Sequence, residues 1–99
     1  MQFELRYWDS PYDLVAESNT LDDVLAAIGN SSDPNDLINY NVIDTVGERT
    51  VRLWEEAGEE FYVQQTLPEA GAQFEFETGE PEARLNAAKQ KVRVLINVS

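Results

Sequence analysis

The sequence predicts a single α+β domain over residues 1–99, with two helices packed on a mainly antiparallel sheet of about five to seven strands. Three observations support this prediction. Several segments alternate apolar and polar residues between short turn signals, which is typical of antiparallel strands. One segment repeats its apolar residues every three or four positions, as an amphipathic helix does. Hydrophobic residues make up 42% of the chain, enough for one small core.

The first elements are a hairpin and a helix. Strands are expected at residues 2–8 and 12–17, because a turn signal, Asp9-Ser10-Pro11, separates two apolar segments. A helix is expected at residues 20–29. Its apolar face consists of Leu21, Val24, Leu25 and Ile28. Thr20 is expected to cap this helix with Asp23 in a capping box, and Gly29 to end it.

The remaining chain predicts further strands and a second helix. Residues 40–46, 50–55 and 61–66 are rich in β-branched and aromatic residues, and Phe74 and Phe76 alternate with two glutamates in a short strand. Pro81 opens a shorter helix at residues 81–90. Residues 91–98 are expected to form a last strand, buried on both faces, because Val92, Val94, Ile96 and Val98 alternate and Leu95 is also apolar.

The charge of the chain is high and unevenly distributed. The chain contains nineteen acidic and seven basic residues, which gives a formal net charge of -12. Residues 83–99, however, contain four basic residues and no acidic one. This balance argues against direct binding to nucleic acid or to anionic lipid, because like charges repel. The sequence contains no signal-peptide pattern and no apolar run long enough to span a membrane. We therefore expect a cytoplasmic protein of a prokaryotic or virus-infected cell.

The residue types that are missing exclude most catalytic chemistry. The chain contains neither histidine nor cysteine, so it lacks the commonest general base, the commonest transition-metal ligand and any thiol nucleophile. It also contains neither a glycine-rich dinucleotide motif nor a phosphate-binding loop. The expectation is a protein that is not an enzyme and needs no cofactor and no metal.

Two groups of glutamates are candidate partner-binding residues. The first group is Glu55, Glu56, Glu59 and Glu60, and the second is Glu75, Glu77, Glu80 and Glu82. The first group could bind a hard cation, but its spacing matches no known cation-binding loop, and a solvated turn is the simpler interpretation. In the second group, alternate strand residues project from one face about 6.6–6.8 Å apart. Such a row could imitate a phosphate backbone, or it could protect a sheet edge from aggregation.

Aromatic and basic residues add two further candidates. Trp8 is expected on the strand face opposite Phe3, Leu5 and Tyr7, where it could be exposed and anchor a partner, or could pack in the core like most tryptophans of small domains. Trp54 is expected in the core. The basic segment at residues 84–93 holds the four basic residues near the C-terminus: Arg84, Lys89, Lys91 and Arg93. It could neutralise the protein's own acidic surface, or dock on the acidic face of a second copy to give a homodimer.

These features favour an interaction protein over an enzyme. The leading hypothesis is an inhibitor that occupies a basic, nucleic-acid-binding surface of a partner complex by imitating phosphates. In size and charge the chain is similar to anti-CRISPR and anti-restriction proteins, many of which are phage proteins; this is a similarity of class and not of motif. One alternative is an antitoxin or immunity protein that neutralises a basic toxin. Another is a small halophilic protein whose acidity is an adaptation to salt.

Overall fold

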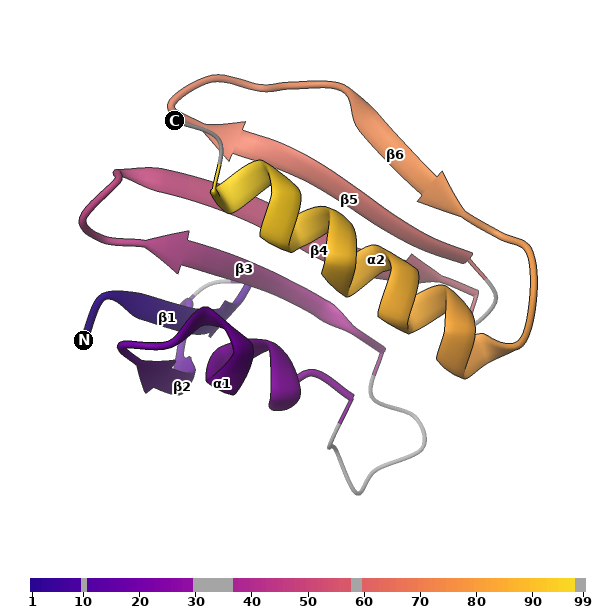
Figure 1. Cartoon of the computed structure of the whole chain (residues 1–99), viewed down its shortest axis with the longest axis horizontal. Coiled ribbons are helices and arrows are strands. Elements are labelled where there is room, and N and C mark those ends of the chain that lie inside the picture. Colours follow the sequence, from indigo (N-terminus) through magenta and orange to yellow (C-terminus); the bar gives the residue numbers. More distant parts are fainter. Residues whose placement is uncertain (10, 30–36, 58–59, 98–99) are drawn as a thin grey trace.

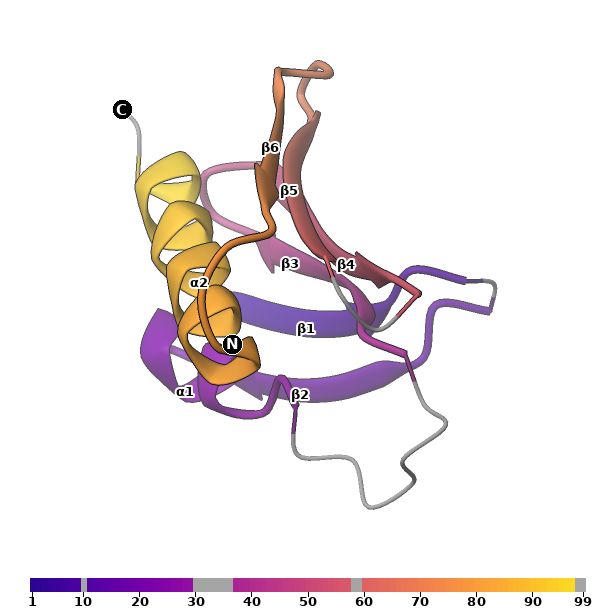
Figure 2. The ribbon, with the colours of Figure 1, turned by 90° about the vertical axis from the view of Figure 1, so that its right-hand side faces the viewer.

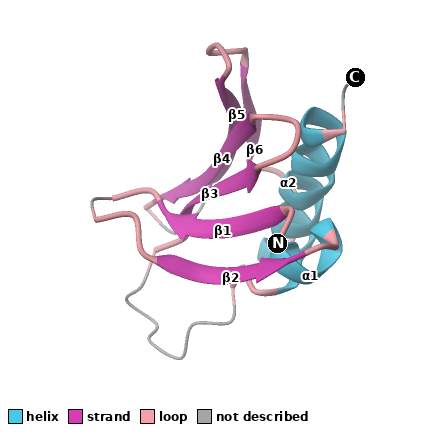
Figure 3. Ribbon diagram, turned by 90° about the vertical axis from the view of Figure 1, so that its left-hand side faces the viewer, coloured by secondary structure: helices cyan, strands magenta, loops and turns pink. Residues whose placement is uncertain are grey.

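The computed structural model describes residues 1–9, 11–29, 37–57 and 60–97 (Figure 1). In chain order the elements are β1 (Phe3–Tyr7), β2 (Leu14–Ser18), α1 (Leu21–Ala26), β3 (Asn39–Asp44), β4 (Arg49–Glu56), β5 (Glu60–Leu67), β6 (Gln73–Phe76) and α2 (Pro81–Ile96). All neighbouring strands are antiparallel, and the sheet order is β2-β1-β3-β4-β5-β6. Figures 2 and 3 show both helices on one side of this sheet. The predicted α+β class, with strands and two helices, is confirmed.

The hydrophobic core lies between the two helices and one face of the sheet. Val42, Val51, Leu53 and Val63 occupy the centre of that face and are fully buried. Because side chains alternate along a strand, every second residue of β3, β4 and β5 reaches this core. The helices contribute the other half of the core, namely Leu21, Val24, Leu25, Ala88, Val92 and Ile96.

Helix α1 is shorter than the predicted range of residues 20–29. After Ala26 the chain tightens into a turn, and Gly29 adopts a left-handed backbone with a φ of 92°. Thr20 stands at the N-cap position, but its side chain makes no capping hydrogen bond. The predicted capping box is therefore wrong. Instead the Ser18 hydroxyl donates to Asp23 Oδ2 at 2.9 Å and accepts the Thr20 amide at 3.1 Å, so the end of β2 supports the start of the helix.

The predicted strand at residues 91–98 is wrong over the described residues, because helix α2 continues to Ile96 instead of ending near residue 90. Val98 lies outside the described residues. The apolar residues of this segment fit both periods. Ala88, Val92 and Ile96 recur every four positions and form the buried stripe of the helix, whereas Val94 is 48% exposed. No glycine or proline follows Pro81 within the helix to end it. The segment that was expected to form a seventh strand is therefore part of a continuous helix, which packs on β4 and β5.

No helix within the described ranges combines the length and the apolar character needed to cross a membrane. Helix α2, the longest, has 16 residues and carries charged side chains along its length.

Two matched substitutions in α2 separate the helical from the strand interpretation. Val92→Ala should lower the free energy of unfolding by about 2 kcal/mol, because it removes two buried methyl groups and leaves a cavity. Val94→Ala should change stability by less than about 0.5 kcal/mol, because this side chain is half exposed. Urea unfolding of both variants measures the difference. Equal losses in the two variants would contradict the helix, since a strand would bury both valines on the same face.

Candidate functional site

The sheet face that the helices leave uncovered, which we call the open face, carries most of the residues that could contact a partner. It presents the side chains that alternate with those of the core. Trp54 and Tyr62, for example, are neighbours of Leu53 and Val63 in sequence but point to the other side of the sheet.

A row of side chains crosses the open face from β1 to β6. The Trp8 amide donates to the Asn39 carbonyl at 3.1 Å, so Trp8 lies beside Asn39. Asn39 pairs with Trp54, Trp54 pairs with Tyr62, and Tyr62 pairs with Glu75. Strand pairing therefore joins the two tryptophans, a tyrosine and a glutamate in one line, although they come from four separate strand regions.

Arg52 is held between the two tryptophans. Its guanidinium carbon lies 4.0 Å from the centre of the Trp8 ring and 4.2 Å from the centre of the Trp54 ring. Arg52 Nε donates to Asn39 Oδ1 at 3.1 Å, which fixes the plane of the guanidinium. Burial lowers the pKa of Arg52, while Asp9 and Glu56 act in the opposite direction. The cation is thus sandwiched between two aromatic faces, which is a favourable arrangement.

The aromatic stack continues from Trp54 to Tyr62. Their ring centres lie 5.4 Å apart and their planes are inclined by 16°. Both residues are buried, although they lie on the open face, because Arg52 and the neighbouring glutamates cover them. Trp54 is thus buried as predicted, but outside the main core. The stack is a second, smaller apolar layer that stiffens the centre of the open face.

Three glutamates meet at the end of this stack. Glu60 from β5, Glu75 from β6 and Glu77 just after β6 each place a carboxylate oxygen within 4.8 Å of the others. The Tyr62 hydroxyl donates to Glu60 and lies 3.3 Å from Glu75 Oε1. We call Glu60, Glu75 and Glu77 the acidic triad.

The acidic triad perturbs the ionisation of Glu77 and of Tyr62. The pKa of Glu77 is raised, first by the negative charge of Glu75 and then by a hydrogen bond between the two carboxyl groups; burial and Glu60 raise it further. The pKa of Tyr62 is raised because its hydroxyl donates to Glu60 and because the ring is buried. Both shifts indicate a concentrated negative potential at this corner of the open face.

The structure divides the first predicted group of glutamates. Glu56 and Glu60 are cross-strand partners on the open face. Glu55 lies on the opposite face, where its carboxylate accepts the Ile38 amide at 2.7 Å and helps to hold β4 against the start of β3. Glu59 lies outside the described residues. The described members therefore do not form a single cluster, and of these only Glu56 and Glu60 lie on the open face.

The second predicted group is also divided. Glu75 and Glu77 project from the open face, whereas Glu80 is the N-cap residue of α2 and Glu82 lies in its first turn. Negative side chains at a helix N-terminus are stabilised by the helix dipole, which gives these two residues a structural role. The predicted row of four glutamates thus ends at Glu77.

The acidic triad is the part of the described chain where carboxylates come closest to a cation-binding arrangement. Hard cations take about six to eight oxygen ligands, often with neutral carbonyl oxygens among them. Three carboxylates, of which Glu75 and Glu77 are exposed, are explained more simply as a negative surface patch.

Trp8 lies at the opposite end of the row from the acidic triad and is 41% exposed. Nearby in the β1–β2 turn, Tyr12 is 52% exposed, and Arg6 donates to its carbonyl at 3.0 Å. Tyr7 stacks on Tyr40 with ring centres 5.5 Å apart. Trp8 is therefore an exposed ring on the open face, held in place by Arg52 beneath it, whereas Tyr7 and Tyr40 lie on the face that the helices cover.

Sequence reasoning missed Arg52 and Tyr62. The signal was present in the alternation of β4 and β5, because Arg52 and Trp54 lie two residues apart on one face, and Tyr62 alternates with the core residues Phe61 and Val63. The contact of Arg52 with Trp8 and that of Tyr62 with Glu75 could not be predicted from the sequence, because they depend on which strands are neighbours in the sheet.

The basic segment at residues 84–93 makes contacts within its own chain. Arg93 Nε pairs with Asp22 Oδ1 at 2.7 Å, and Lys89 Nζ donates to the Ile28 carbonyl at 3.1 Å. Lys91 Nζ lies 3.9 Å from the centre of the Phe74 ring. These contacts join α2 to α1 and to β6. Homodimer formation through this segment stays a prediction.

Comparison of the chain with protein-family models, with curated proteins and with solved structures finds no significant match. The geometry of the open face is therefore the basis for a functional assignment.

The Arg52 sandwich should contribute to stability through Trp8. In a double-mutant cycle with Arg52→Met and Trp8→Ala, the coupling free energy should be about 0.5–1 kcal/mol, as for other partly exposed cation–π pairs. Lys89→Met, on the helical side of the molecule, serves as the control and should show no coupling to Trp8. Urea unfolding of the single and double variants measures both cycles. A coupling indistinguishable from that of the control would show that the sandwich contributes no stability.

The pKa of Glu77 should fall when Glu75 is made neutral. Glu75→Gln removes the charge that contributes most to the raised pKa of Glu77, so its side-chain carboxyl ¹³C signal should titrate at lower pH. Glu69→Gln, which removes a charge elsewhere, should leave this titration unchanged. Because the folded state binds this proton more tightly than the unfolded chain, the contribution of Glu77 to stability should rise as the pH falls through its folded pKa. An unchanged Glu77 titration in Glu75→Gln would contradict the assigned cause.

Proposed function

We propose that this protein is a non-enzymatic inhibitor that occupies a basic, nucleic-acid-binding surface of a partner complex. Contact is made by the open face, with the acidic triad and Glu56 as the negative groups and Trp8 as an exposed aromatic anchor. The protein acts by excluding nucleic acid from that surface. Its carboxylates occupy the positions that the phosphates of a nucleic acid would take.

The observation that carries this proposal is the convergence of the acidic triad on an uncovered sheet face. Glu60 and Glu75 come from different strands, yet their carboxylates lie beside Glu77, and no basic side chain is among the causes that shift the pKa of Glu77. A raised pKa at Glu77 means that the acidic triad is electrostatically unfavourable when all three carboxyl groups are ionised. A cationic surface on a partner would relieve this repulsion, so binding and charge neutralisation would favour each other.

The rest of the open face suits the same role. The net charge of -12 would steer a basic partner toward the protein and speed association at low salt. Trp8 offers an exposed ring at a fixed position, and tryptophan and arginine are enriched among residues that dominate binding energy. The stack beneath it keeps the open face rigid, which lowers the entropic cost of binding.

An inhibitor of this kind would act in the cytoplasm of a prokaryotic or virus-infected cell, as phage-encoded anti-CRISPR and anti-restriction proteins do. The absence of histidine and cysteine from the sequence is consistent with a role that requires no catalysis.

The partner can be identified by affinity capture on the immobilised protein. Native host lysate is applied at low salt, and bound proteins are eluted with double-stranded DNA and identified by mass spectrometry. A nucleic-acid-binding complex released by DNA is the expected result. A small basic protein that DNA does not displace would contradict nucleic-acid mimicry and favour the antitoxin or immunity alternative.

Two variants of equal charge then locate the contact surface. Neutralising Glu56, Glu60, Glu75 and Glu77 to glutamine should weaken partner binding at least about tenfold, a loss of ~1.4 kcal/mol spread over four charge contacts. The matched control neutralises Glu48, Glu69, Glu80 and Glu82, which are exposed residues in turns and at the start of α2. Titration calorimetry with the captured partner measures both. Equal weakening by the two variants would mean that net charge alone matters, and that the open face is not the binding surface.

A further inference from the structure

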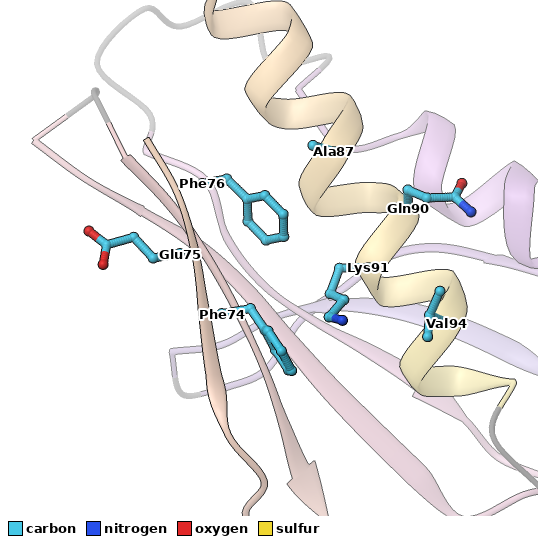
Figure 4. A pocket seen from close by; sticks show the side chains of 7 residues that line it. All are labelled: Phe74, Glu75, Phe76, Ala87, Gln90, Lys91 and Val94. Carbon is cyan, nitrogen blue, oxygen red and sulfur yellow. The ribbon is translucent and has the colours of Figure 1, made fainter. Parts of the chain in front are cut away.

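A groove separates the edge strand β6 from helix α2 and has a volume of about 360 Å³. Figure 4 shows Phe74 and Phe76 pointing from β6 toward the helix, while Glu75 points to the opposite side of the sheet. The helix supplies Ala87, Lys91 and Val94 to the other wall. The groove is therefore mostly apolar, and the acidic triad lies on the other side of the same strand.

The outer edge of β6 is available for pairing. β6 is the last strand of the sheet and has a neighbouring strand, β5, on one side only. Figure 1 shows no described segment along its outer side. An edge strand presents backbone amide and carbonyl groups that a further strand can pair with. A strand added there would place alternate side chains over the groove and beside Glu75 and Glu77.

A second copy of this chain is a poor occupant of the edge. In an antiparallel pair, residues directly opposite each other share one face of the sheet. Two antiparallel β6 strands with their open faces on the same side would therefore bring the Glu75 side chains of the two copies opposite or close to each other, although carboxylates at this corner already repel each other within one molecule. The same glutamates would favour a strand that carries lysine or arginine at these positions.

We propose that β6 is a strand-addition site for an extended basic segment of a partner protein. Apolar side chains of that segment enter the groove against Phe74, Phe76 and Val94, and the alternate lysines or arginines lie on the open face beside the acidic triad. This inference rests on the proposed function, because it specifies how part of the basic partner is recognised. Strand addition also requires that apolar and basic residues alternate in the partner segment, whereas attraction by charge alone requires only that the segment be basic.

A synthetic peptide tests the proposal without a known partner. The probe is a blocked heptapeptide in which lysine alternates with valine, and the control has the same composition with its three valines consecutive. Titration into ¹⁵N-labelled protein should shift the amide signals of β6 and of Val94, and should slow hydrogen exchange of β6 amides, with the alternating peptide only. Equal binding of both peptides, or binding that leaves β6 exchange unchanged, would overturn the proposal.

A matched pair of variants tests the groove. Val94→Gln should weaken binding of the alternating peptide at least about fivefold, which corresponds to ~1 kcal/mol. Val46→Gln makes the same change at an exposed valine in the β3–β4 turn and should have no effect. Val94 is half exposed, so both variants should fold, and unfolding curves verify this. Equal affinity in both variants would overturn the groove contact.

The outcomes of this test and of the partner experiment are separable. If the peptide does not protect β6 but partner binding still depends on the open-face glutamates, the strand-addition site is wrong and the proposed function stands. If the peptide protects β6 but the partner is insensitive to those glutamates, the proposed function is wrong and the edge remains a binding site for basic strands. Protection of β6 that increases with protein concentration alone would show that a second copy occupies the edge.

Discussion

The packing of α2 against β4 and β5 is the constraint on which the rest of the molecule depends. A chain of 99 residues has enough apolar surface for one main core, and the stripe formed by Ala88, Val92 and Ile96 directs that core to one face of the sheet. Because α1 packs on the same side, neither helix covers the other face of the six-stranded sheet. The identity of the open face, and therefore of every residue that could meet a partner there, follows from where the helices bury their apolar residues.

An antiparallel sheet can face water on one side, but large aromatic side chains on that side are more stable when other side chains cover them. Here that shielding comes from side chains of the face itself, since Arg52 covers Trp54 while Glu60 and Glu75 cover Tyr62. Amphipathic groups of this kind hide apolar surface under charged ends. The result is a face that is stiff at its centre and charged at its surface, and this combination supports an interaction role for it.

The corner formed by β5 and β6 combines features that elsewhere in the molecule occur separately. It has the acidic triad on one side of the sheet, the apolar groove on the other and an unpaired strand edge between them. Like charges along an edge oppose self-association, as they do in many sheet proteins. The same charges would attract the proposed cationic partner, so resistance to aggregation and the proposed selectivity for basic segments would have one physical origin.

The sequence alone determined the α+β class, the first helix, the excess of acidic residues and the absence of histidine and cysteine, because composition and local periodicity carry this information. It did not determine residues 91–96, whose apolar residues fit a strand and a helix equally; burial against the sheet decided for the helix. Nor could it bring Glu60 to Glu75, or Arg52 to Trp8. These contacts depend on strand order and register, which are set by non-local packing across the whole sheet and not by any single segment.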